Sequence, residues 1–403
     1  MRFDIESELL IRCCTASATS SAAIGELAAR PVEWDRFLAL ANRNSVTPLV
    51  AARLGAEAAA YLPQDLARAF ELSYQVNALR SNHLARCAAE IAEAFAASDV
   101  PAIAIKGPTL AIAAYGDVAL RVFGDLDFVV RLADLPRAAE VLMRIGYSSP
   151  TYFAEAVESG FFADVSLDYS REDSVVDLHW QLAPSYFPFA PEGEQVWNRT
   201  SEIDLLGRRV RVLGPADSIL FQACHGSKHG WRTLAQICDF ARLLATATPV
   251  NWTSLLDEAR RTRSLRMLLL GAELAHSLEL CEVPAELLDA GRRDSHVASL
   301  SRRVTRGIFD LNRAVDFEEW SIGLGSIEKL RDRFRYIIER LVAALEPEDV
   351  VIGGGNIVHL KKLPRGCRAG NNADAFIGGF RMWNNTYGAI HRLRSRARIP
   401  PAH

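Results

Sequence analysis

Two aspartates one residue apart, Asp125 and Asp127, begin an otherwise apolar run that has the composition of a strand. Side chains alternate across a strand, so both carboxylates are expected on one face and Leu126 and Phe128 on the other. Like charges held this close repel one another and resist desolvation unless a cation lies between them. A divalent metal ion is the simplest such cation. The alternative is an exposed strand edge that carries two solvated acids.

A candidate phosphate-binding corner precedes the two aspartates. The apolar run at residues 100–105 continues into Lys106-Gly107-Pro108-Thr109, which predicts a strand, a tight turn and the start of a helix. Pro108 suits the first helical position, and Gly107 lets backbone amides approach an anionic group.

A third carboxylate follows in a second candidate strand, residues 174–180. Alternation places Asp177 and His179 on one face of this strand and the apolar Val176 and Leu178 on the other. The chain therefore offers three acids, each on a strand-like segment.

These pieces occur in the order strand, helix, strand with two aspartates, helix at residues 135–145, then further strands. That order is similar to the nucleotidyltransferase superfamily, which includes polymerase-beta-like and antibiotic-modifying enzymes. From about Asn77 to Leu244 the sequence resembles the bacterial family known as uncharacterised nucleotidyltransferases. The motifs that carry the resemblance are Lys106-Gly107, Tyr115, Arg121, Asp125-Leu126-Asp127, Gly146-Tyr147 and Val176-Asp177-Leu178-His179-Trp180.

The resemblance implies a metal-dependent active site. Asp125 and Asp127 would coordinate one or two Mg²⁺ ions, or Mn²⁺ in their place, which bridge a nucleoside triphosphate such as ATP. Asp177 would bind the second metal ion or accept the proton of the acceptor. His179 faces the same way, and it either takes a direct part or packs beside Trp180.

The sequence departs from the wider superfamily at the phosphate-binding turn. The usual Gly-Ser turn is replaced by Lys106-Gly107-Pro108-Thr109, with a longer gap before the aspartates. Lys106, Gly107 and Thr109 are therefore candidate nucleotide-binding residues, with Lys106 as a point charge on a phosphate oxygen. Arg121 could add a bidentate clamp. Lys106 and Arg121 are alternatively ordinary surface cations.

Two histidines in the segment after this core are candidates for the cleft where nucleotide or acceptor binds. His225 and His229 lie one helical turn apart, and Lys228 lies beside them. That spacing suits a transition metal, although no obvious third ligand accompanies it. Asp239, farther along the same helical region, is a weaker candidate, and a solvated acid or a salt-bridge partner is the favoured interpretation.

Length and composition describe an ordinary multidomain protein. The chain has 403 residues, 49% of them hydrophobic and 24% charged, with a formal net charge of -3. This charge argues against a dedicated nucleic-acid binder, so a small molecule or a protein is the expected acceptor.

Seven cysteines without a Cys-x-x-Cys pair indicate a reducing compartment. Without an apolar leader or membrane-spanning run, the protein is predicted to be cytoplasmic, with no membrane partner.

The expected fold is α/β (α+β), a small mixed nucleotidyltransferase sheet with flanking helices. Apolar spacing, for example at Leu66, Phe70, Leu72, Val76 and Leu79, predicts amphipathic helices in the N-terminal region. The predicted domains are a helical region at 1–98, the α/β core at 99–213, a helical region at 214–345 and a tail at 346–403.

The tail resembles the C-terminal end of ROK-family sugar kinases. An apolar strand-like run ends in Gly353-Gly354-Gly355, and a similar turn helps to close those kinases over nucleotide. The N-terminal phosphate segment and catalytic aspartate of such kinases are missing, so the tail is expected to be a fragment without kinase activity.

The leading functional hypothesis is transfer of a nucleoside monophosphate from a nucleoside triphosphate to an acceptor, with release of pyrophosphate. The alternative is a non-catalytic module that senses a nucleotide or a sugar on the same scaffold. Retention of the three carboxylates, Asp125, Asp127 and Asp177, favours the enzyme.

Overall fold

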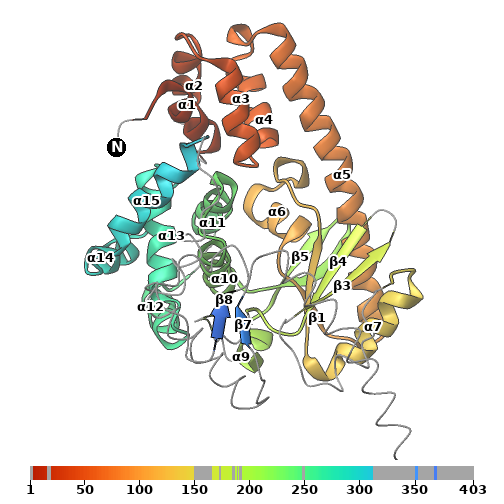
Figure 1. Cartoon of the computed structure of the whole chain (residues 1–403). Helices are drawn as coiled ribbons and strands as arrows, with labels where there is room; N and C mark the ends of the chain where they lie inside the picture. The colour runs from red at the N-terminus through yellow and green to blue at the C-terminus, as the bar shows by residue number, and fades with distance from the viewer. Residues whose placement is uncertain are drawn as a thin grey trace, which may run out of the picture. The chain divides into compact units, whose positions relative to one another are not determined.

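The chain divides into two compact units, Met1–Gly323 and Leu324–His403 (Figure 1). The computed structural model describes residues 3–15, 20–148, 166–171, 174–183, 187, 189, 193–246, 250–311, 350–352 and 367–369. The fold class is confirmed, because the first unit is built on a mixed sheet with helices around it.

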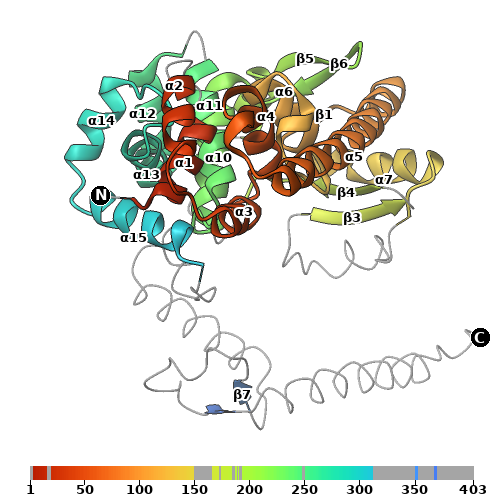
Figure 2. The same ribbon diagram turned by 90° about the horizontal axis from the view of Figure 1, so that it is seen from above.

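Six strands form this sheet in the order β3-β4-β2-β1-β6-β5. Two pairs are parallel, β2 with β4 and β1 with β6, and the other three neighbouring pairs are antiparallel. Figure 2 shows β5 and β6 at one edge of the sheet and β3 at the other. The strands are β1 (Ala102–Ala104), β2 (Leu126–Val130), β3 (Ser166–Arg171), β4 (Ser174–His179), β5 (Ser201–Leu205) and β6 (Arg208–Val212).

One face of the sheet is covered by α5 (Gln64–Ala97) and α7 (Leu135–Arg144), where the main hydrophobic core lies. Leu126 and Phe128 of β2 and Leu178 of β4 point into this core. The ring of Phe128 meets that of Phe95 on α5 edge to face, with centroids 5.7 Å apart. Burial of alternate apolar side chains fixes the strand register, so the residues between them must face the other side.

The opposite face is flanked by α6 (Gly107–Tyr115), α10 (Pro215–Lys228) and α11 (Leu234–Thr246). Figure 1 shows α10 and α11 on the side of the sheet away from α7. Four helices follow: α12 (Trp252–Arg261), α13 (Leu265–Ser277), α14 (Ala285–Arg292) and α15 (Val297–Phe309). The short elements of the unit are α9 (Gly193–Asn198) and the 3₁₀ turns η1 (Ala59–Tyr61), η2 (Val118–Leu120) and η3 (Leu132–Asp134).

The N-terminal region is helical, as the apolar spacing predicts. Its helices before α5 are α1 (Ile5–Cys14), α2 (Ser20–Ala28), α3 (Trp34–Arg43) and α4 (Thr47–Glu57). Asn44, which follows α3, is fully buried and joins this region to the later helices. Its side chain accepts a hydrogen bond from Leu234 N at 2.9 Å and donates one to Ile308 O at 3.1 Å.

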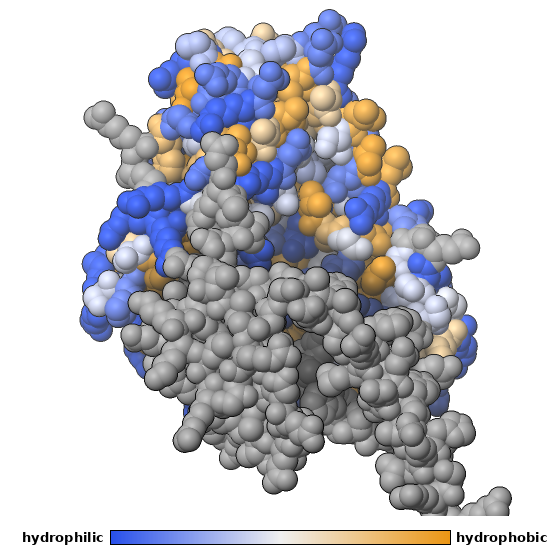
Figure 3. All heavy atoms as spheres, in the orientation of Figure 1, coloured by the Kyte–Doolittle hydropathy of each residue, from blue (hydrophilic) through white to orange (hydrophobic). Residues whose placement is uncertain are grey.

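The apolar residues that predict α5 belong to two different faces of that helix. Leu66 and Phe70 are buried, whereas Leu72, Val76 and Leu79 are exposed. Figure 3 shows hydrophobic residues gathered over α5. The spacing therefore predicts a helix correctly, but it does not tell which apolar face is covered.

In the second unit the described residues form one parallel pair, β7 (Val350–Ile352) with β8 (Cys367–Ala369). The strand before Gly353 is therefore confirmed, while the glycine turn itself lies outside the described residues. The similarity to sugar kinases is not shown by the structure. Across the described ranges, no helix combines the length and the apolar character needed to cross a bilayer.

Candidate metal and nucleotide site

The register of β2 and β4 brings two carboxylates together. The strands run parallel, and Asp127 lies directly opposite Asp177. Their apolar neighbours, Leu126 on β2 and Val176 and Leu178 on β4, are buried in the core on the other face. The alternation that buries these neighbours turns both carboxylates away from α5 and toward a cleft.

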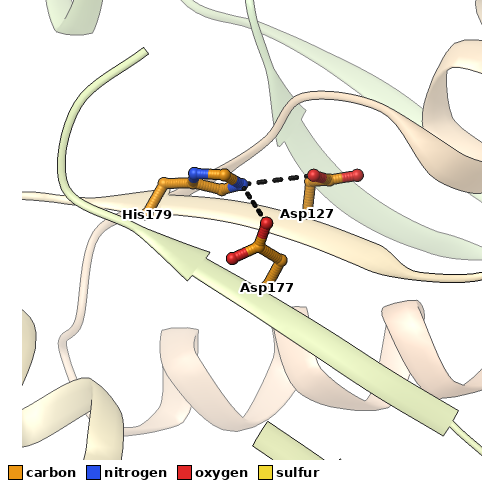
Figure 4. A group of neighbouring side chains, drawn as sticks. All are labelled: Asp127, Asp177 and His179. Carbon is orange, nitrogen blue, oxygen red and sulfur yellow. Dashed lines mark hydrogen bonds and ion pairs between the residues drawn. The ribbon is translucent and has the colours of Figure 1, made fainter. Parts of the chain in front are cut away.

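His179 completes a group of three converging side chains (Figure 4). Its Nε2 lies 3.2 Å from Asp127 Oδ1 and 3.1 Å from Asp177 Oδ2. One ligand atom from each of the three residues lies within 4.8 Å of the others, and in the described ranges this is the one group of three or more His, Cys, Asp or Glu side chains arranged in that way. Two carboxylates and an imidazole are ligands that divalent metal ions accept in proteins.

The hydrogen-bonding capacity of these carboxylates is incompletely used. Asp127 is 2% exposed, and its Oδ1 forms an ion pair with Lys106 Nζ at 2.6 Å. The second oxygen of each acid, Asp127 Oδ2 and Asp177 Oδ1, is buried and has no hydrogen-bond partner among the described residues. A buried charged oxygen without a partner is costly, so each of the two acids keeps an unused oxygen that a cation could bind.

Two basic side chains, Lys106 and His179, lie against Asp127. Burial alone would raise the pKa of the Asp127 carboxyl, but the hydrogen bond with His179 and the charge of Lys106 hold it below its usual value. Burial alone would lower the pKa of His179, but its hydrogen bonds to Asp127 and Asp177 raise it above its usual value. The ammonium and the imidazole thus favour the charged form of the carboxyl.

Asp125 lies beside this group and not within it. The strand β2 begins at Leu126, so the alternation argument applies to Asp127 and does not fix the direction of Asp125. Asp125 lines the same cleft, and burial together with the charge of Asp127 raises its pKa. Gly107 packs against it: a Cβ at position 107 would lie 3.2 Å from Asp125 O, and the backbone there has a φ of +57°. A glycine is therefore needed at this turn.

The predicted nucleotide-binding residues lie around the start of α6. Lys106 and Gly107 line the cleft, and Lys106 already pairs with Asp127. The Thr109 hydroxyl is buried and donates to Lys106 O at 2.8 Å, so it supports the turn. The prediction that these residues hold phosphate stays a prediction.

Arg121 also lines the cleft, but its side chain is engaged with Asp239 of α11. Its Nε lies 3.1 Å from Asp239 Oδ1 and 3.0 Å from Asp239 Oδ2. The Tyr115 hydroxyl donates to Asp239 Oδ1 at 2.8 Å. Asp239 is therefore a buried salt-bridge partner that joins α11 to the segment leading into β2, a role that the sequence alone left open.

Side chains from α10 form the other wall of the cleft, whose volume is about 530 Å³. His225 stacks on Phe221 and meets His229 edge to face, with the two histidine centroids 4.6 Å apart. Burial, together with the charge of Lys228, lowers the pKa of His229 to about 4, and that of His225 is also well below its usual value. These imidazoles are neutral near pH 7, and they lie outside the converging group of Asp127, Asp177 and His179.

One acid that lines the cleft belongs to no recognisable sequence motif. Asp168 lies on β3 directly opposite Asp177 and lines the same cleft. Recognising residues 166–171 and 174–179 as a hairpin would have paired these two residues.

No curated protein matches the chain. Among solved structures, an antigenic nucleotidyltransferase-like protein from Paracoccidioides brasiliensis matches with 12% identity and a TM-score of 0.31, over 51% of this chain and 96% of that one. A likeness of that strength carries no argument about function.

The family comparison is more informative. Residues 30–278, more than half of the chain, match the family described as uncharacterised nucleotidyltransferase. The matched segment includes the converging group, the turn at Lys106 and the cleft wall on α10. The chain therefore belongs to the family of uncharacterised nucleotidyltransferases.

Proposed function

We propose that the protein is a metal-dependent nucleotidyltransferase that moves a nucleoside monophosphate from a nucleoside triphosphate to an acceptor and releases pyrophosphate. The observation that carries the proposal is the convergence of Asp127, Asp177 and His179, in which each acid keeps one buried oxygen without a hydrogen-bond partner among the described residues. Family membership supports the reaction class.

Asp127, Asp177 and His179 would hold a divalent ion, for which Mg²⁺ or Mn²⁺ is proposed. Asp125 adds negative charge at the same end of the cleft. The ion would supply charge neutralisation at the reacting phosphate. The register of β2 and β4 holds Asp127 and Asp177 opposite one another, so both acids could bind the ion without rearrangement of the strands.

Lys106 and the start of α6 would receive the phosphates of the nucleotide. A helix N-terminus presents free backbone N–H groups and a partial positive charge, and Lys106 adds a full charge beside it. Arg121 would attract the phosphates of the nucleotide, while its ion pair with Asp239 keeps the guanidinium in position.

The proposal is tested by measuring pyrophosphate release from each nucleoside triphosphate with and without Mg²⁺. The wild-type protein should release pyrophosphate only with the metal ion, and Asp177→Asn should lose most of that rate. Glu202→Gln is a matched acid-to-amide control, because Glu202 lies on the edge strand β5 and does not line the cleft. Nucleotide binding that does not depend on Mg²⁺, with no pyrophosphate release, would instead support the sensing module.

A further inference from the structure

Three acids of the cleft are aligned across the sheet. Asp168, Asp177 and Asp127 occupy directly opposed positions on β3, β4 and β2, so they form one row across three neighbouring strands. Residues directly opposed across a strand pair share a face, and all three line the cleft. The row ends at the β1 side with Lys106, which pairs with Asp127.

A second cation lies near Lys106 at the β1 side. Arg121 Nη1 donates a hydrogen bond to Gly107 O at 3.5 Å, at the start of α6. At the other end of the row of acids lies Asp168, an exposed residue on the edge strand β3.

We propose that Asp168 belongs to the acceptor subsite, and that the acceptor reacts through a hydroxyl or an amine and carries no phosphate group near it. This inference rests on the proposed function. Lys106 and the start of α6, proposed above to receive the triphosphate, lie at the β1 side, which leaves the β3 end for the second substrate. A carboxylate there accepts hydrogen bonds from O–H or N–H groups and repels a phosphate.

Asp168 is not part of the converging group of Asp127, Asp177 and His179, so its role differs from theirs. It would contact the acceptor and orient it toward the α-phosphorus. In the transfer, the acceptor oxygen or nitrogen forms a bond to that phosphorus, and the bond from the phosphorus to the bridging oxygen breaks. Pyrophosphate leaves with the electron pair, and the proton of the acceptor passes to water.

The experiment uses the full chain with Mg²⁺, its preferred nucleoside triphosphate and matched probes. The probes are glycerol with glycerol 3-phosphate, glucose with glucose 6-phosphate, and a set of primary amines. Products are followed by mass. The wild-type protein should transfer to members without phosphate, and Asp168→Asn should raise the KM for such an acceptor about tenfold. Asp168→Lys should shift the preference toward the phosphorylated member of each pair.

Two controls separate this role from others. Asp168→Asn should bind α,β-methylene-ATP with Mg²⁺ within about twofold of the wild-type affinity, because Asp168 lies outside the metal group. Glu202→Gln, on the opposite edge strand, should change neither the KM nor the preference. Weakened nucleotide binding in Asp168→Asn would place this residue with the metal or the nucleotide, and would overturn the assignment.

The outcomes also distinguish this inference from the proposed function. If the wild-type protein releases no pyrophosphate with any nucleoside triphosphate, the proposed function fails and the acceptor subsite fails with it. If pyrophosphate is released but transfer goes only to phosphorylated probes, or to none of the probes, the acceptor assignment alone is overturned. An unchanged preference in Asp168→Lys has the same consequence.

Discussion

Two buried carboxylates in this molecule, Asp127 and Asp239, have opposite surroundings. Asp239 has a partner for each oxygen: the Tyr115 hydroxyl and Arg121 Nε at Oδ1, and Arg121 Nε again at Oδ2. Asp127 has Lys106 and His179 at Oδ1, but its buried Oδ2 has no partner in the described structure.

The difference separates a structural salt bridge from a reactive site. A buried charge whose hydrogen bonds are complete holds elements together, here α11 and the segment before β2. A buried charge with an unused oxygen beside a second such acid is costly to keep, and it retains the capacity to bind an ion. Four predictions test the contrast.

The largest effect is expected on turnover. Asp127→Asn keeps the shape of the side chain but removes the charge that would hold the metal ion, so kcat should fall by roughly a thousandfold or more. Pyrophosphate release measures it, and circular dichroism should show an unchanged fold. If a tenth of the rate remains, Asp127 is not a metal ligand.

The next effect is on stability. Asp239→Ala would leave the Arg121 guanidinium buried without its partner, and should lower the free energy of unfolding by about 3–5 kcal/mol. Urea denaturation measures the loss. Asp257→Ala, which removes an exposed ion pair with Arg260 on α12, should cost less than about 1 kcal/mol. Equal losses in the two variants would contradict the role given to Asp239.

Metal binding should distinguish the site of Asp127 from the buried network of Asp239 and Tyr115 without any activity measurement. At a Mn²⁺ concentration about 100 times its dissociation constant, the wild-type protein should gain about 2.7 kcal/mol of stability. Asp127→Asn should lose this gain, and Tyr115→Phe should keep it. A gain that survives in Asp127→Asn would mean that the ion binds elsewhere.

The smallest effect is expected at the hydroxyl that supports Asp239. Tyr115→Phe removes one hydrogen bond to a buried carboxylate that still has Arg121, so it should cost about 1–2 kcal/mol of stability. Denaturant midpoints of Tyr115→Phe, Asp239→Ala and the double variant measure the coupling. Additive losses would show that Tyr115 and Asp239 act separately.

The strands that carry the acids were predictable because their signal is local. Val176 and Leu178 are buried and Asp177 and His179 face the cleft, as alternation predicts. The start of α6 at Gly107 was equally readable, because Pro108 and the glycine mark a helix start. The position of Asp125 outside the converging group could not be predicted, because it depends on the residue at which β2 begins.

By itself the sequence determined the family, the helical or extended character of the segments around the site, and the face of β4 that carries Asp177 and His179. Only the tertiary structure decided that Arg121 pairs with Asp239 and that Asp168 lies opposite Asp177. The physical reason is the range of the forces involved. Backbone sterics and apolar periodicity act over a few residues, whereas the partner of a charge depends on which distant strands and helices pack side by side.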